Sequence, residues 1–86
     1  MAPAALERLV VRAAESVDGA RVRRPKRSVE IAHGAGRATV SLEVAAGHDV
    51  AVPELARAVQ ARVAEAVAST SGLEIESVDV TVTEIA

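Results

Sequence analysis

The chain has 86 residues, the size of one domain, and half of them are apolar although Phe, Trp and Tyr are absent. A domain of this length removes roughly 60 to 65% of its unfolded surface from water, so a core built mainly from Val and Ala leaves a thin stability margin. Self-association is one way in which a domain with so small a core can gain stability.

The sequence excludes several classes of protein. Without cysteine the chain forms neither disulfides nor thiolate or Cys-type zinc sites, which fits a reducing compartment. Residues 1–11 do not resemble a signal peptide, because Glu7 and Arg8 interrupt the apolar stretch. There is no run of about 18 apolar residues, so we expect no transmembrane segment. We expect the protein in the cytoplasm, at most peripheral to the inner membrane face.

Charge is unevenly distributed along the chain. The formal net charge is −2, yet residues 21–27 hold five of the ten basic residues. We call residues 21–27 the basic segment, and all twelve acidic residues lie outside it. Its cations are the candidates for binding an anion or a partner: Arg21, Arg23, Arg24, Lys26 and Arg27.

The spacing of apolar residues predicts the first elements. Residues 4–17 repeat them at intervals of three and four, as on one face of a helix, and Gly19 ends the pattern. Residues 20–27 indicate a short extended piece followed by a loop, because Pro25 disfavours a helical conformation at the residue before it.

A hairpin and a crossover follow. Residues 29–33 and 38–45 alternate apolar and polar side chains, as in strands with one buried face, and the glycines between them suit a hairpin turn. After a connector, residues 53–70 form the longest apolar stripe, with Pro53 at the first helical position. Residues 75–85 alternate again and predict a third strand.

The predicted order is α-β-β-α-β, in a single domain over residues 1–86. This is a two-layer α/β (α+β) class, with two helices packed on one face of a three- to four-stranded mixed sheet. We expect the second helix to pack on the strands: Leu55, Val59, Val63 and Val67 on Val40, Leu42, Val44, Val78, Val80 and Val82. The other face displays small polar residues, and four of them are interface candidates: Thr39, Ser41, Thr81 and Thr83.

Residues for catalysis or metal binding are scarce. The only histidines are His33 in the hairpin turn and His48 in the connector, and neither has a neighbourhood like that of a catalytic triad. With Asp49 they fall short of the four ligands of structural zinc. The turn at 34–36 leads into a strand and not into a helix, which favours a hairpin over a phosphate loop. We predict no catalytic residue, no metal and no cofactor.

The basic segment leaves two interpretations open. It either attracts nucleic-acid phosphates or anionic lipid headgroups, or it is a solvated loop that balances the acidic remainder of the chain. Carboxylates of the chain itself are candidate internal partners: Glu15, Asp18, Glu74 and Glu76. Single-stranded nucleic acid is disfavoured because no aromatic side chain is present to stack on bases.

Five short patterns occur in a fixed order within residues 6–85: GARV at 19–22, ATVSLEV at 38–44, AVQARV at 58–63, SGLEI at 71–75 and VDVTVTEI at 78–85. Together they resemble the alkaline shock protein family, the Gls-type envelope stress response proteins of bacteria. The resemblance implies cytoplasmic, stress-linked proteins without established enzymatic activity, some self-assembling and some held near the membrane by a separate anchoring protein. Two features depart from the family: Ala46 replaces an aromatic before Gly47, and the basic segment is unusually basic.

The residues and the resemblance lead to one expected function. We expect a non-enzymatic envelope or alkaline stress response protein that self-assembles or docks a protein partner, including a membrane-anchored one. The alternative is a small nucleic-acid-binding or regulatory module that uses the basic segment. Salt-sensitive binding to DNA or RNA distinguishes the alternative.

Overall fold

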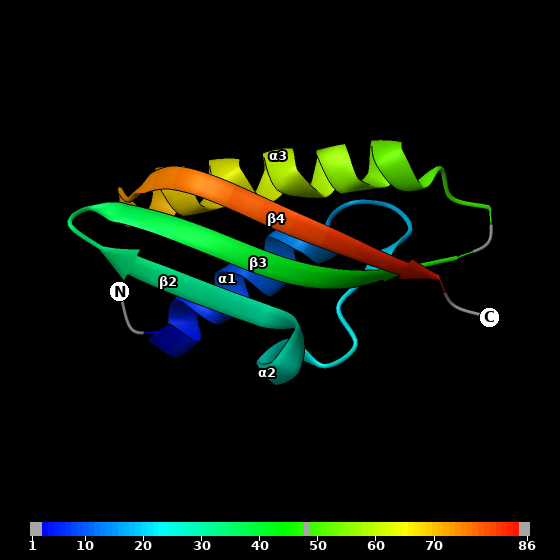
Figure 1. Ribbon diagram of the computed structural model, residues 1–86, viewed down its shortest axis with the longest axis horizontal. Helices are drawn as coiled ribbons and strands as arrows, with labels where there is room; N and C mark the ends of the chain where they lie inside the picture. Colours follow the sequence, from blue (N-terminus) through cyan, green and yellow to red (C-terminus); the bar gives the residue numbers. More distant parts are fainter. Residues whose placement is uncertain (1–2, 48, 85–86) are drawn as a thin grey trace.

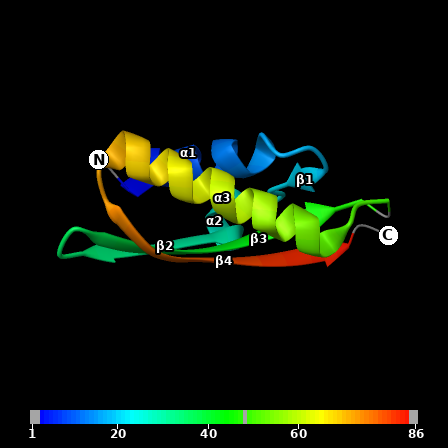
Figure 2. The same cartoon turned by 90° about the horizontal axis from the view of Figure 1, so that it is seen from above.

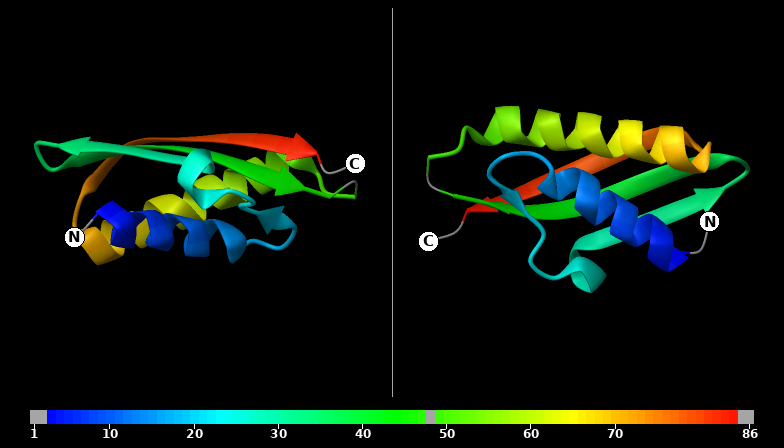
Figure 3. Two further views of the ribbon diagram at one scale, coloured as in Figure 1. Left: turned by 90° about the horizontal axis from the view of Figure 1, so that it is seen from below. Right: turned by 180° about the vertical axis from the view of Figure 1, so that it is seen from behind.

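The computed structural model describes residues 3–47 and 49–84. Its elements in chain order are α1 (Pro3–Glu15), β1 (Ala20–Arg21), α2 (Pro25–Ser28), β2 (Val29–Gly34), β3 (Arg37–Ala46), α3 (Val52–Ser71) and β4 (Glu74–Glu84). The two long helices, α1 and α3, lie side by side on one face of the sheet (Figure 1, Figure 2). The other face carries no helix layer (Figure 3). The predicted two-layer class is confirmed.

β3 is the central strand of a four-stranded mixed sheet. β1 and β2 pair antiparallel with one side of β3, β1 near its end and β2 along its first part. β4 pairs parallel with the other side over the whole length of β3. A parallel neighbour is expected, because the chain passes from β3 to β4 through a helix that crosses over the sheet.

The core lies between α3 and the inward face of the sheet. Val40 and Val44 of β3 and Val59, Val63 and Val67 of α3 are fully buried, and Leu42 and Leu55 are almost so. Each such side chain stabilises the fold by about 1.5–3 kcal/mol. The valines of β4 are only partly buried against the same cluster: Val78, Val80 and Val82. The predicted packing is confirmed, with weaker cover on β4 because it is an edge strand.

A β-bulge in β4 interrupts the alternation of inward and outward side chains along this strand. Ala38 pairs with Ile75, but the next residue, Thr39, pairs with Ser77, so one residue of β4 is extra at this point. This β-bulge at Glu76 brings Ile75 to the same face as Val78, three positions away. Ile75 therefore packs against the core although strict alternation from Val78 places it on the outer face.

The loop predicted for the second half of residues 20–27 is wrong, because Pro25–Ser28 form the short helix α2. The carbonyl oxygen of Arg24 accepts hydrogen bonds from the backbone N–H groups of Arg27 at 2.9 Å and Ser28 at 2.8 Å. Proline suits the first helical position because its missing N–H has no partner there. Arg24 itself stays outside the helix, as expected for the residue before a proline.

The ends of α3 differ slightly from the prediction. The helix begins at Val52, so Pro53 stands in its second position, and Ala51 provides no side-chain cap. Gly72 ends the helix in the left-handed conformation, with φ 73°, and its N–H donates to the carbonyl of Ala68 at 3.3 Å. The predicted stop at Gly72 is confirmed, since glycine adopts positive φ without steric cost.

The hairpin between β2 and β3 turns through two residues, because Gly34 pairs with Arg37. Both central residues have positive φ, 52° at Ala35 and 77° at Gly36. This combination is typical of a type I′ turn, which favours Asn followed by Gly. Ala35 is therefore held in a region that is sterically unfavourable for its Cβ atom.

Replacing Ala35 with Asn should stabilise the protein by on the order of 1 kcal/mol, because asparagine tolerates the left-handed conformation. Thermal unfolding followed by circular dichroism should show a higher Tm for A35N. The matched control is A32N, which introduces the same residue at an exposed position of β2 and should not raise the Tm. A lower or unchanged Tm for A35N would contradict this account of the turn.

Candidate functional site

The basic segment borders the side of β3 that faces away from β4. It leaves β1, which pairs with the end of β3, and reaches β2 through α2. Val22 is buried with 7% of its surface exposed and joins the core, whereas its neighbours Arg21 and Arg23 are exposed. The backbone N–H of Val22 donates to a carboxylate oxygen of Glu15 at 3.2 Å. One apolar anchor and one hydrogen bond thus position the segment.

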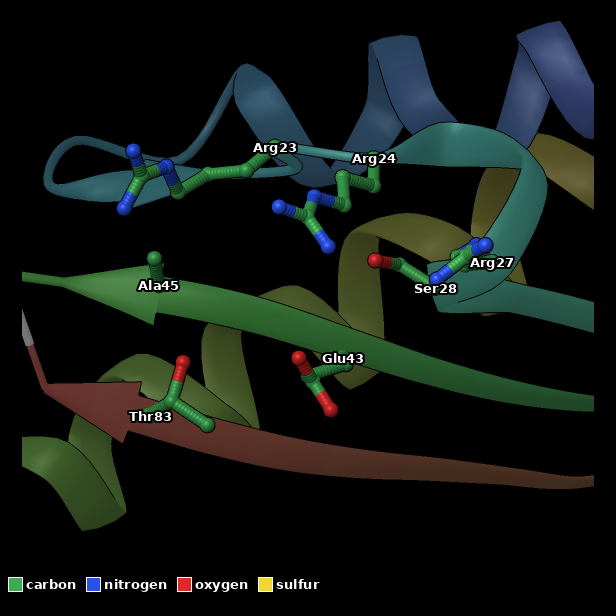
Figure 4. A pocket seen from close by; sticks show the side chains of 7 residues that line it. All are labelled: Arg23, Arg24, Arg27, Ser28, Glu43, Ala45 and Thr83. Carbon is green, nitrogen blue, oxygen red and sulfur yellow. The ribbon is translucent and has the colours of Figure 1, made fainter.

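Three of the five cations of the basic segment line one cleft of about 470 Å³ (Figure 4). The side chains of Arg23 and Arg24 extend from the segment toward β3, and Arg27 lies in α2, shortly before β2 begins (Figure 4). The complete lining is Arg23, Arg24, Arg27, Ser28, Glu43, Ala45 and Thr83. We call it the arginine cleft, and its second wall is the outer face of β3 and β4.

The other two cations lie elsewhere. Arg21 shares a separate hollow with Glu15 and Asp18, next to the end of α1. Lys26 is exposed on α2 and is not part of the arginine cleft. The structure therefore brings together three of the five residues that the sequence singled out.

Two of the four carboxylates expected near the basic segment are in the wrong place for that role. Glu15 and Asp18 lie beside Arg21, as anticipated. Glu74, however, pairs with Arg37 at the opposite end of β3, and Glu76 follows it. The parallel direction of β4 separates them from the segment, since β1 borders the far end of β3.

The four polar interface candidates lie on the outer face, as predicted, but they do not form one cluster. Thr83 lines the arginine cleft, and its hydroxyl donates to the carbonyl of Val44 at 3.3 Å. Ser41 and Thr81 border a neighbouring hollow that also contains Arg27 and the carboxylates of Glu30, Glu43 and Asp79. Thr39 is half-buried nearer the hairpin, and its hydroxyl donates to the carbonyl of Ala32 at 3.5 Å.

Glu43 is the functional candidate that sequence reasoning placed on the correct face but did not connect with the arginines. It is exposed on β3 and borders both the arginine cleft and the neighbouring hollow. Its only signal in the sequence is its place in the alternation of residues 38–45, since a period of two assigns a face and no partner across the sheet. The cleft therefore has mixed charge, with cations on one rim and a carboxylate on its floor.

The structure describes the surroundings of one of the two histidines. His33 is exposed on β2 next to the hairpin, and His48 lies outside the described residues. Within residues 3–47 and 49–84, no group of three His, Cys, Asp or Glu side chains is placed to hold a metal ion. In the same residues, no helix has both the length and the apolar character needed to cross a membrane.

Removing the carboxylate of Glu15 should loosen the basic segment. In E15A the N–H of Val22 loses its acceptor, so the protein should be destabilised by about 0.5–1 kcal/mol, and the Val22 amide should exchange hydrogen faster. E15Q is the matched control, because its side-chain oxygen still accepts this bond. Equal amide exchange at Val22 in E15A and in the unaltered protein would show that Glu15 does not hold the segment.

The fold is similar to solved structures of a domain named MamM CTD. The variant MamM-CTD D249A superimposes with a TM-score of 0.72 at 23% identity, covering 96% of this chain and 98% of that chain. MamM CTD C267S gives a TM-score of 0.69 at 22% identity and covers 96% of both chains. A zinc form of MamM CTD D249N gives 0.68 at 22% identity, covering 96% of this chain and 86% of that chain. At this identity the similarity shows the fold alone.

A search of curated proteins gives no match. A family model does match, over residues 6–86, and its family is described as having a cell envelope-related function. The match extends over most of α1 and over every later element described above. The chain therefore belongs to the alkaline shock protein family, the family that its sequence resembles.

Proposed function

We propose that this protein is a non-enzymatic interaction module of the envelope or alkaline stress response, which docks an acidic segment of a partner protein in the arginine cleft. The observation that carries the proposal is the gathering of Arg23, Arg24 and Arg27 on one rim of a cleft open on the outer face of the sheet. The family supplies the cell-envelope context. In this proposal the protein self-assembles in the cytoplasm, and its partner is anchored at the inner membrane face.

The shape and charge of the cleft favour a narrow peptide. Guanidinium groups bind carboxylates through paired, charge-assisted hydrogen bonds, so an extended acidic segment can follow the rim from Arg23 to Arg27. Its backbone N–H groups then have Glu43 as an acceptor on the floor. Each exposed charge pair contributes about 0–1 kcal/mol, so the binding depends on several arginines acting together and weakens with salt.

A lipid surface or a nucleic acid fits this face less well. Both present dense negative charge over a wide area, and the outer face carries carboxylates beside the cleft at Glu30, Glu43 and Asp79. Phosphates that approach the arginines from a broad surface would also approach these carboxylates, which costs electrostatic energy. An extended peptide lowers this cost because it can direct its carboxylates to the arginines and its backbone N–H groups to Glu43.

Nucleic-acid binding is the second candidate, because all five cations of the basic segment are exposed. It requires only that phosphates contact the segment itself. The chain contains no Phe, Trp or Tyr to stack on bases, so the binding would be carried by charge and would fall steeply with salt concentration.

Changing the three arginines of the cleft together should weaken binding without unfolding the protein. For R23S/R24S/R27S we expect at least a roughly ten-fold weaker affinity for a fluorescent oligoglutamate peptide, measured by anisotropy at low salt, and a nearly unchanged Tm. The control is R8S/R37S/R57S, which removes the same charge from exposed positions on α1, β3 and α3. It should keep most of the affinity.

The same titrations with a DNA duplex and with phosphatidylglycerol vesicles separate the alternatives. Tighter binding of DNA or vesicles than of the peptide would replace the proposed partner by that class. Equal losses in both triple variants would show that net charge and not the cleft is responsible. If the unaltered protein binds none of the three probes at low salt, the basic segment is a solvated loop.

A further inference from the structure

β4 has a long backbone edge that no described strand covers. It is 11 residues long and pairs with β3 on one side only. Proteins usually protect such an edge with proline, lysine, bulges or a very short strand. Between Ser77 and Glu84 the sequence SVDVTVTE contains no proline or lysine, and the one bulge in the pairing of β3 with β4 lies before it.

The direction of the backbone groups on this edge follows from one hydrogen bond. The side-chain amide of Gln60 on α3 donates to the carbonyl oxygen of Val78 at 2.9 Å. α3 lies along the side of β4 that faces away from β3 (Figure 1, Figure 3), so this carbonyl points to the free edge. Because N–H and C=O directions alternate along a strand, Val80 and Val82 also direct their backbone groups outward.

The side chains of the same three residues are incompletely covered. Val78, Val80 and Val82 are partly buried, whereas Val40 and Val44, which lie beside two of them on β3, have 0% of their surface exposed. A further strand on the edge would remove this remaining apolar surface from water. The edge therefore offers apolar surface together with outward backbone groups, of which the carbonyl of Val78 already accepts from Gln60.

The face of α3 above the edge leaves room for another molecule. Ala56, Gln60 and Ala64 follow each other at intervals of four, so they lie on one side of the helix, the side from which Gln60 reaches β4. Two of the three are alanines, and none is charged. Among the charged residues of α3, Arg57 stands three positions before Gln60 and flanks this side. The others lie elsewhere on the helix: Glu54, Arg62 and Glu65.

We propose that a second copy of this chain pairs with β4 in antiparallel orientation, around a two-fold axis at Val80, so that two sheets become one. This specifies the surface for the self-assembly included in the proposed function, but it uses a different part of the molecule from the arginine cleft. The two copies contribute the same surface, as in other two-fold dimers. The outward backbone groups of Val78, Val80 and Val82 then bond to Val82, Val80 and Val78 of the second copy. The carbonyl of Val78, which accepts from Gln60, uses its second lone pair for this bond.

The side-chain pattern selects this register. With the axis at Val80, valine faces valine at all three positions and Asp79 faces Thr81 of the second copy. The pairing extends over residues 77–83 only, because Glu76, at the bulge, would face Glu84 of the second copy. An axis at Asp79 would set two carboxylates opposite each other, which is destabilising. An axis at Thr81 would set Val78 opposite Glu84 of the second copy. Shifting the pairing by one residue would place the valines of one copy on the same face as the polar residues of the other.

In this register a positive and a negative charge at position 81 should have opposite effects on the stability of the dimer. Thr81 is exposed on the outer face. In the proposed dimer it faces Asp79 of the second copy, and the two-fold symmetry gives two such pairs. Cross-strand charge pairs are modest individually, so we expect T81K to tighten the dimer about two- to ten-fold and T81D to weaken it by a similar factor. The double variant D79K/T81D should restore dimerisation. Sedimentation equilibrium over a concentration series measures all three constants.

A control variant tests the position of the charge. S41D places a carboxylate beside Asp79 on the β3 side, because Ser41 and Asp79 are paired, and it does not face the second copy. It should leave the dissociation constant within about two-fold. An equal response to S41D and T81D would overturn the proposed register, as would T81K weakening the dimer. Circular dichroism at high dilution establishes that each variant folds.

Hydrogen exchange gives a readout that does not depend on substitutions. The amides of Val78, Val80 and Val82 should exchange more slowly as the protein concentration rises, whereas amides on β2 should not change. A protein that stays monomeric up to about 1 mM, or protection that appears on β2 and not on β4, would overturn the proposal. R23S/R24S/R27S should dimerise normally, so failure of peptide docking and failure of the β4 dimer are separately visible.

Discussion

β3 is the strand on which the other elements depend. It is hydrogen-bonded on both sides, and its inward residues Val40, Leu42 and Val44 are almost entirely removed from water beneath α3. The chain has no aromatic residue to fill a wide core, so the helices must approach the sheet closely through valine, leucine and alanine. Ala38 and Ala46, buried near the two ends of β3, are consistent with such a close approach.

The alternation that buries one face of β3 also builds the candidate site. Because successive side chains point to opposite faces, the burial of Val44 places Glu43 and Ala45 on the outer face, where they line the arginine cleft. The basic segment is held next to them by the same logic, since Val22 enters the core and turns Arg21 and Arg23 outward. The position of the cations therefore depends on apolar contacts on the other side of the sheet.

The two edges of the sheet differ in how continuous they are, and the arginine cleft and the free backbone edge of β4 lie at different edges. β1, α2 and β2 together follow one side of β3, so that edge consists of short pieces interrupted by a helix. β4 forms the other edge alone and pairs with all of β3 apart from the single bulge. The arginine cleft lies on the interrupted side, whereas the uncovered backbone lies on the continuous side. The proposed docking and the proposed self-association therefore centre on different residues, although Thr83 of β4 belongs to both surfaces.

Periodicity in the sequence predicted the long helices, the long strands and the faces that they bury, but not the short helix α2. The period of two in residues 38–45 and the intervals of three and four in residues 53–70 depend only on local geometry, and they correctly assigned the inward residues of β3 and α3. Gly72 and Pro53 marked the ends of α3 to within one residue for the same reason. The patterns at 19–22, 38–44 and 78–85 also identified the family.

Which residues lie next to one another depends on how the strands pair in space. Arg23, Arg24 and Arg27 share a cleft with Glu43 because β1 and β2 both pair with β3, and with Thr83 because β4 runs parallel to β3. Periodicity does not contain these pairings. The same pairing moved Glu74 and Glu76 away from the basic segment. The positive φ of Ala35 and the hydrogen bond from Gln60 to Val78 also depend on how strands and helices pair in space. Local physics sets what each segment is, and long-range pairing sets what it faces.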